Sequence, residues 1–166
     1  MNLTEIFFYF FILLAAISAG AIVFSGDVFK SALLLLTCLL SIAALYVLSF
    51  AEFIAVTQIL IYAGGILVII IFGIMLTTKI SGQALTVQNT NIFSGGIAGI
   101  GLLTLLVRYL PDIPPAESKG LQPQDISVIG LKIFSLYSLP FEIAGLLLLV
   151  ALVGAAVITS HLKSKV

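Results

Sequence analysis

EFIAVTQILIYAGGILVIIIFGIMLTT, residues 52–78, is the stretch that decides the fold. It is apolar for longer than any element of a soluble protein needs, and its one charged side chain, Glu52, stands at its first position. A helix of about 24 residues, at 1.5 Å per residue, reaches roughly 36 Å, which exceeds the bilayer core of about 30 Å. Because an isolated strand cannot pair its backbone groups in hydrocarbon, the stretch predicts a transmembrane helix.

Tyr62, Gly64 and Gly65 interrupt this run near its middle. Each glycine weakens an α-helix by about 1 kcal/mol relative to alanine. Adjacent glycines either let another helix approach closely or allow a π-bulge, a defect often found at functional sites. The Tyr62 hydroxyl needs a partner at this depth, because an unpaired polar group in hydrocarbon is costly. The residues by themselves leave two interpretations open, a close-packing helix and a functional site.

The composition places the whole chain in a membrane. Of its 166 residues, 61% are hydrophobic and 8% are charged, and the mean hydropathy is +1.31. A soluble domain of this size needs more charged surface. The seven acidic and seven basic residues balance, so nothing indicates a nucleic-acid partner.

The hydropathy pattern predicts one all-α membrane domain, residues 1–166, with five transmembrane helices. The predicted spans are residues 3–24, 31–50, 53–76, 92–110 and 141–161. The prolines after the fourth span predict an extramembrane loop at 111–128. The apolar segment 126–137 is too short to span and is expected to lie at the membrane interface.

No pattern in the chain predicts chemistry of its own. The single cysteine, Cys38, excludes an internal disulfide, and with one histidine, His161, no metal-ligand spacing is present. There is no Ser/His/Asp set, phosphate loop or haem or iron–sulfur motif. We therefore expect no catalytic, cofactor-binding or metal-binding residues in this chain.

Two blocks of sequence carry a resemblance to a known family. Residues 51–77, AEFIAVTQILIYAGGILVIIIFGIMLT, resemble the third transmembrane helix of subunit J of proton-pumping NADH:quinone oxidoreductase, respiratory complex I, whose mitochondrial counterpart is NADH dehydrogenase subunit 6. Tyr62 and Gly65 fall on the family's Tyr-x-Gly-Gly/Ala segment. Residues 138–156, SLPFEIAGLLLLVALVGAA, resemble the last helix of the family. One position departs: Gln58 stands where many members have a glutamate.

The resemblance implies a mechanism that spacing alone does not supply. It implies a membrane-arm subunit that links quinone reduction to proton pumping through a switchable third helix. Tyr62, Gly64 and Gly65 would form a π-bulge, and its conversion to α-helix would turn an apolar gate formed by Val68 and Phe72.

Three polar residues of the same helix are candidates for the proton path. They are Glu52, Gln58 and Tyr62. Glu52 has a second explanation, because a carboxylate at a helix N-terminus is stabilised by the helix dipole. Gln58 does not ionise, so the proton-carrying role of the family's glutamate does not transfer to it directly.

The resemblance also implies the surroundings of the chain. Partners would be the lipid bilayer and subunits A, H, K and N of the membrane arm, while other subunits would bind NADH, FMN, iron–sulfur clusters and quinone. The location would be a bacterial inner membrane. A small excess of basic residues on the C-terminal side predicts an outside N-terminus and a cytoplasmic C-terminus.

Three alternatives come from other classes of protein. The chain could belong to a related antiporter-type complex, or be a purely structural scaffold that fits the sparse charge but leaves the Tyr/Gly-Gly interruption unexplained. A stand-alone channel or transporter should carry charged residues at mid-membrane, and here none lies centrally in a predicted span.

Overall fold

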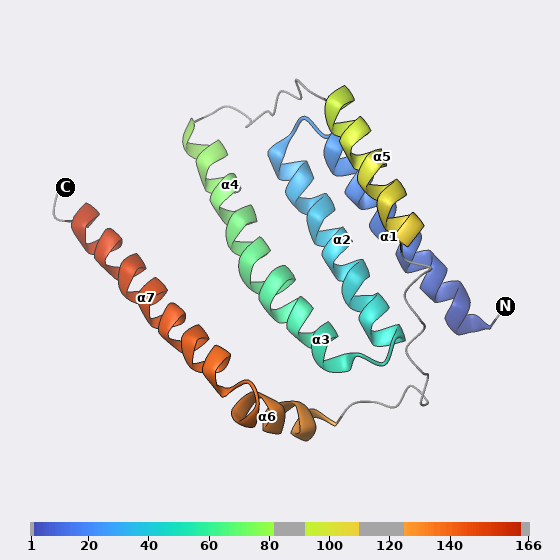
Figure 1. Cartoon of the computed structure of the whole chain (residues 1–166). Helices are drawn as coiled ribbons and strands as arrows, with labels where there is room; N and C mark the ends of the chain where they lie inside the picture. Colours follow the sequence, from blue (N-terminus) through green and yellow to red (C-terminus); the bar gives the residue numbers. More distant parts are fainter. Residues whose placement is uncertain (1, 82–91, 110–124, 164–166) are drawn as a thin grey trace. The chain divides into compact units, whose positions relative to one another are not determined.

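The computed structural model describes residues 2–81, 92–109 and 125–163, and its regular elements are helices (Figure 1). In chain order they are α1 (Leu3–Phe24), α2 (Val28–Leu48), α3 (Glu52–Thr57), the π-helix η1 (Gln58–Leu67), α4 (Val68–Ser81), α5 (Ile92–Tyr109), α6 (Ile126–Ser135) and α7 (Ser138–Lys163). By contact, the chain divides into two compact units between residues 123 and 124, and each is described by itself.

Polar caps fix where the first two helices begin. The Asn2 backbone N–H donates to Glu5 Oε2 at 3.1 Å, at the start of α1. Asp27 Oδ1 accepts from the Phe29 backbone N–H at 2.8 Å, at the start of α2. Such caps satisfy N–H groups that have no partner inside the helix. The Asp27 cap explains why α2 begins three residues before the predicted span 31–50.

The turn between α2 and α3 is short because the chain reverses at a left-handed residue. Phe50 has φ 58°. The Ala51 backbone N–H donates to the Tyr46 carbonyl at 2.9 Å, and the Phe50 N–H donates to the Val47 carbonyl at 3.0 Å. This is the Schellman pattern, in which glycine usually occupies the left-handed position. It places the start of α3 directly beside the end of α2 and forms the hairpin expected from the sequence.

Small side chains make up most of the interior of the first unit. Helix α2 contacts α1 on one side and the continuous helix α3–η1–α4 on the other. The buried residues are Ser18, Ala32, Ser41, Ala43, Ala55, Ala63 and Leu67. The Cys38 thiol lies 3.6 Å from the Ala15 carbonyl oxygen and links α2 to α1. Small residues at helix interfaces let membrane helices approach closely.

The second unit is a corner between α6 and α7. The backbone N–H groups of Leu136 and Tyr137 both donate to the Lys132 carbonyl, each at 3.0 Å. The rings of Phe134 and Phe141 meet edge to face with centroids 5.0 Å apart. Two linking residues and this ring contact fix the bend between the helices.

The start of α6 lies inside the predicted loop 111–128. Most of that loop is outside the described residues, but residues 126–128 form the first turn of α6. Asp125 caps this turn by accepting the Ser127 backbone N–H at 3.0 Å. That hydrogen bond holds the pKa of the Asp125 carboxyl below its ordinary value.

Four helices are long and apolar enough to cross a bilayer. They are Leu3–Phe24, Val28–Leu48, Glu52–Ile80 and Ser138–Ser160. Most large apolar side chains on these helices are exposed within the chain, so lipid or other proteins must cover them. The predicted all-α integral membrane protein is therefore confirmed. The apolar part of α5, Ser94–Tyr109, is shorter, so the predicted span 92–110, and with it the total of five, stays a prediction.

The close packing of α2 gives a first test. Ala43 is buried in α2, and Ala43→Leu adds three carbon atoms where no room exists. We expect a loss of about 1–3 kcal/mol in stability, as for other overpacked cores. The measurement is protease resistance and thermal midpoint of the protein in native membranes. Ala16→Leu, at an exposed position of α1, is the matched control and should have little effect. Equal loss in both variants would contradict the packing described here.

Candidate functional site: the π-helical segment

The longest span contains a π-helical segment in its interior. Residues Gln58–Leu67 form η1, and the flanking residues Thr57 (φ −59°, ψ −43°) and Val68 (φ −60°, ψ −42°) have ordinary right-handed helical angles. The chain therefore runs as one helix from Glu52 to Ser81 with a wider section inside it. A π-helix bonds each N–H to the carbonyl five residues earlier, so it holds more residues per turn than an α-helix.

Two glycines fit the backbone of this section. A Cβ atom added at Gly64 would lie 3.2 Å from the Ile59 carbonyl oxygen, and one at Gly65 would lie 3.3 Å from the Leu60 carbonyl oxygen. Both oxygens belong to the residue five positions earlier. At the other glycines that the structure describes, an added Cβ would meet nothing within 4 Å apart from the backbone of its own helix within four residues. A side chain at either position would need the carbonyl oxygen to move by a few tenths of an ångström, so glycine relieves a tight contact within the π-helical segment.

One face of the segment packs against α2 and the other does not. Ala63 is buried, and Leu67 is only 1% exposed; η1 contacts α2. Tyr62 is 49% exposed and lies outside this packed face. No hydrogen bond of its hydroxyl is present among the described residues. In a membrane the hydroxyl therefore needs a partner from outside the described residues.

The comparisons with known proteins agree on one family. Residues 18–158 match the family model of NADH-ubiquinone/plastoquinone oxidoreductase chain 6. The chain belongs to this family. It is 40% identical to "NAD(P)H-quinone oxidoreductase subunit 6, chloroplastic" of Chlorokybus atmophyticus, over 91% of this chain and 81% of the relative. It is 36% identical to "NAD(P)H-quinone oxidoreductase chain 6" of Synechocystis sp., over 95% of this chain and 83% of the relative.

Membership of the chain 6 family confirms the resemblance drawn from residues 51–77 and 138–156. The match extends from within α1 into α7, so it covers the π-helical segment and both units of the structure.

The structure brings four predicted site residues together in this chain 6 protein. Gln58, Tyr62, Gly64 and Gly65 all lie in η1. Gln58 is half-buried at its first position. Their shared location follows from the continuous helix and was expected from the sequence.

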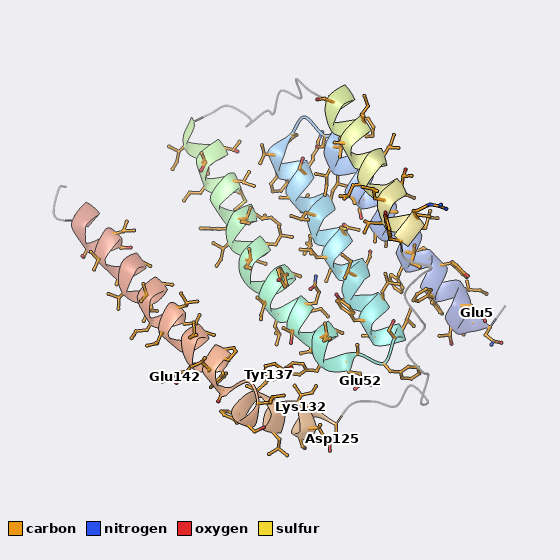
Figure 2. The ribbon with its side chains drawn as sticks, in the orientation of Figure 1. Glu5, Glu52, Asp125, Lys132, Tyr137 and Glu142 are labelled. Atoms are coloured by element: carbon orange, nitrogen blue, oxygen red, sulfur yellow. The ribbon has the colours of Figure 1, made fainter. Side chains whose placement is uncertain are left out.

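The other predicted residues lie on either side of the segment. Val68 and Phe72 follow it in α4, four residues apart on one face, and are 53% and 58% exposed. Glu52 is the first residue of α3, at the end of the helix (Figure 2). It is exposed and lies in the first turn, where the helix dipole favours a carboxylate.

Sequence reasoning missed the residues that hold the segment in place. Ala55, Ala63 and Leu67 are buried on the third span, where the analysis of the sequence assigned no packing face. Their spacing of eight and four residues is a helical period, but most of the neighbouring residues are also apolar. Hydropathy therefore could not distinguish the face of the helix that packs against α2 from the faces that do not. Among the described residues no group of His, Cys, Asp and Glu could hold a metal ion.

The glycine contacts predict how the backbone responds to alanine. Gly65→Ala should shift the segment toward a regular α-helix, because the new Cβ crowds the Leu60 carbonyl in the π form. In the α form alanine is favoured over glycine by about 1 kcal/mol. A high-resolution cryo-EM map of each variant would show the change as a new helical register in residues 68–81. Gly73→Ala, on the same helix with open space around its Cβ, is the control. A retained π-helix in Gly65→Ala would contradict this account.

Proposed function

We propose that this chain is the membrane-arm subunit that links quinone reduction to proton pumping in a complex I-type enzyme, with Gln58–Leu67 as its switch. The observation that carries the proposal is the π-helical segment whose Gly64 and Gly65 each face a carbonyl five residues earlier. Membership of the chain 6 family supports the enzyme, since the matching relatives are named as quinone oxidoreductase subunits.

The switch is an exchange between π and α backbone. Returning one residue from the wide turn to regular helix rotates one half of the span by about 100° relative to the other and moves it about 1.5 Å. Both forms pair their N–H groups with carbonyls of the same helix, so their free energies stay within a few kcal/mol. Glycine at positions 64 and 65 keeps both forms accessible.

Packing decides which half turns. Ala55, Ala63 and Leu67 are buried and anchor α3 and η1 against α2. None of residues 68–80 is buried. The α4 half is therefore the part that rotates, and Val68 and Phe72 turn with it. These apolar side chains form the gate that closes or opens a water path for protons.

The polar residues of the span have distinct roles in this proposal. Tyr62 supplies a hydroxyl and Gln58 an amide that can hydrogen-bond water on the path. Glu52 is the one carboxylate on the span, and it stands at its end. Proton uptake by Glu52 and its stabilisation of the helix N-terminus are compatible roles for one exposed carboxylate.

The wider setting completes the proposal. Helix α5 is the fourth of five spans, and the chain lies in a bacterial inner membrane with its N-terminus outside and its C-terminus in the cytoplasm. Subunits A, H, K and N are its neighbours. NADH, FMN, iron–sulfur clusters and quinone bind to other subunits, so this chain contributes no catalytic residues. Lys30 and Lys79 support this orientation, because basic residues favour the cytoplasmic side.

Activity of the assembled enzyme tests the switch. Gly65→Val should lower quinone reduction and proton pumping together by about tenfold, the factor for roughly 1.4 kcal/mol of bias. Tyr62→Phe removes one hydroxyl at nearly constant volume and should lower both rates less. NADH oxidation by an artificial acceptor at the flavin should stay normal in both variants.

Gly73→Val is the matched control, because it places the same side chain on the same helix in open space. If Gly65→Val assembles and retains wild-type quinone reduction and pumping, the helix is a packing element and the chain is a structural scaffold.

Orientation is tested separately by thiol labelling in a Cys38→Ser background. Gly26→Cys lies in the turn between α1 and α2, and Ser49→Cys lies in the turn between α2 and α3. Since these turns are at opposite ends of α2, an impermeant reagent should label Ser49→Cys in intact cells and leave Gly26→Cys unlabelled. The opposite pattern would reverse the orientation and leave the fold unchanged.

A further inference from the structure

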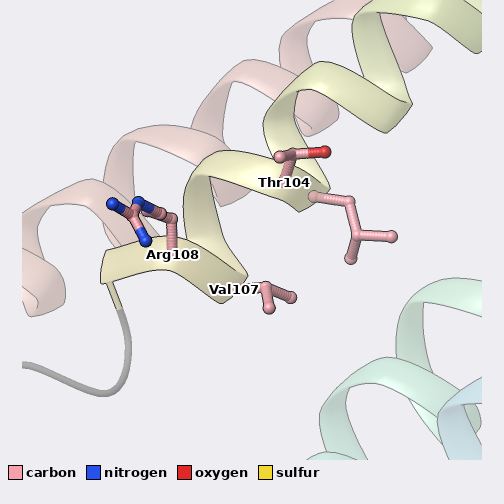
Figure 3. A pocket seen from close by; sticks show the side chains of 4 residues that line it. Thr104, Val107 and Arg108 are labelled. Atoms are coloured by element: carbon pink, nitrogen blue, oxygen red, sulfur yellow. The ribbon is translucent and has the colours of Figure 1, made fainter.

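A hollow of about 440 Å³ lies along the last turns of α5. Its described lining is Leu103, Thr104, Val107 and Arg108 (Figure 3). Leu103 and Val107 are four residues apart, and Thr104 and Arg108 follow them by one residue each. The four side chains therefore lie on one face of the helix. The hollow combines apolar walls with a single cation at the helix end.

Arg108 supplies the positive charge of this face. It is the one charged side chain in the apolar stretch Ser94–Tyr109. Its guanidinium offers five N–H donors in a planar fork. Arg108 forms no ion pair with any residue that the structure describes. The Thr104 hydroxyl donates to the Ile100 carbonyl at 2.8 Å and brings no negative charge.

The apolar side chains of the hollow are open to whatever surrounds the chain. Leu103 and Val107 are both more than half exposed within the chain. Apolar side chains at this position in a span are covered by acyl chains, while a long basic side chain near the helix end reaches toward the headgroups. The required occupant therefore has an anion at one end and a hydrocarbon chain beside it.

We propose that this hollow binds an anionic phospholipid, with the phosphate on Arg108 and an acyl chain along Leu103 and Val107. A guanidinium can donate two hydrogen bonds to one phosphate group. A lipid with net negative charge is favoured over a zwitterionic one, whose own ammonium balances its phosphate. The inference rests on α5 being a span, as proposed above, and is independent of the π-helical switch.

Photo-cross-linking of the assembled complex tests this site. The complex is reconstituted in phosphatidylcholine vesicles that contain a trace of phosphatidylglycerol with a diazirine on one acyl chain. A matched phosphatidylcholine probe is used in parallel. Mass spectrometry measures labelling of the peptide that contains residues 100–109. We expect labelling by the anionic probe to exceed that by the zwitterionic probe by about fivefold.

Single substitutions distinguish the contribution of the Arg108 charge from that of the apolar side chains. Arg108→Gln should reduce labelling by the anionic probe to the level of the zwitterionic probe. Val107→Trp fills the hollow and should reduce labelling by both probes, which keeps the test available if Arg108→Gln fails to assemble. Lys132→Gln removes a different exposed basic residue, in the last turn of α6, and should change nothing.

Three results would overturn the proposal. They are equal labelling of the wild type by both probes, unchanged anionic labelling in Arg108→Gln, and no labelling of residues 100–109 in the wild type. The last result would mean that a neighbouring subunit covers this face of α5. Quinone reduction in the same vesicles reports on the proposed function separately, since a failed lipid site leaves the effect of Gly65→Val intact.

Discussion

In hydrocarbon, every backbone N–H must find a carbonyl within its own helix, and the rest of the structure depends on this constraint. A broken turn in a lipid-facing span would leave polar groups unpaired at a cost of several kcal/mol each. A π-helical turn meets the constraint for its N–H groups, because each one bonds a carbonyl one residue further back in the same helix. The segment Gln58–Leu67 is therefore an irregularity that a membrane span can contain without exposing its backbone.

The same constraint explains where flexibility is found in this chain. Elsewhere the helices are held by small residues on α2 and its neighbours, with Leu67 as the one large buried side chain among the described residues. This packing fixes the part of the span before Val68 and leaves α4 without a buried residue up to position 80. The packed part of the span thus ends, and the unpacked part begins, at the end of η1, next to the two glycines. A conformational step at this point needs no change in the hairpin that supports it.

The exposed apolar surface indicates that the chain is one subunit of a larger complex. No residue of α7 whose side chain is described is buried, and the same holds for α5. Bilayer lipid can cover such helices, but only specific contacts with other protein can fix their positions. Membership of the chain 6 family, which is named for an oxidoreductase of several chains, accounts for that surface. Arg108 adds a positive charge to this surface, and we propose that an anionic lipid binds it.

The sequence by itself determined the class of protein, the helices and the family. Hydropathy and length fixed these features, since a run such as residues 52–78 has only one stable form in a bilayer. The sequence also located Tyr62, Gly64 and Gly65, because these residue types differ from those of the apolar run around them. The tertiary structure decided which face of the span is packed, because Ala55, Ala63 and Leu67 differ little in hydropathy from their neighbours. Only the contact with α2 distinguishes them, and only the backbone geometry shows which glycines a side chain would crowd.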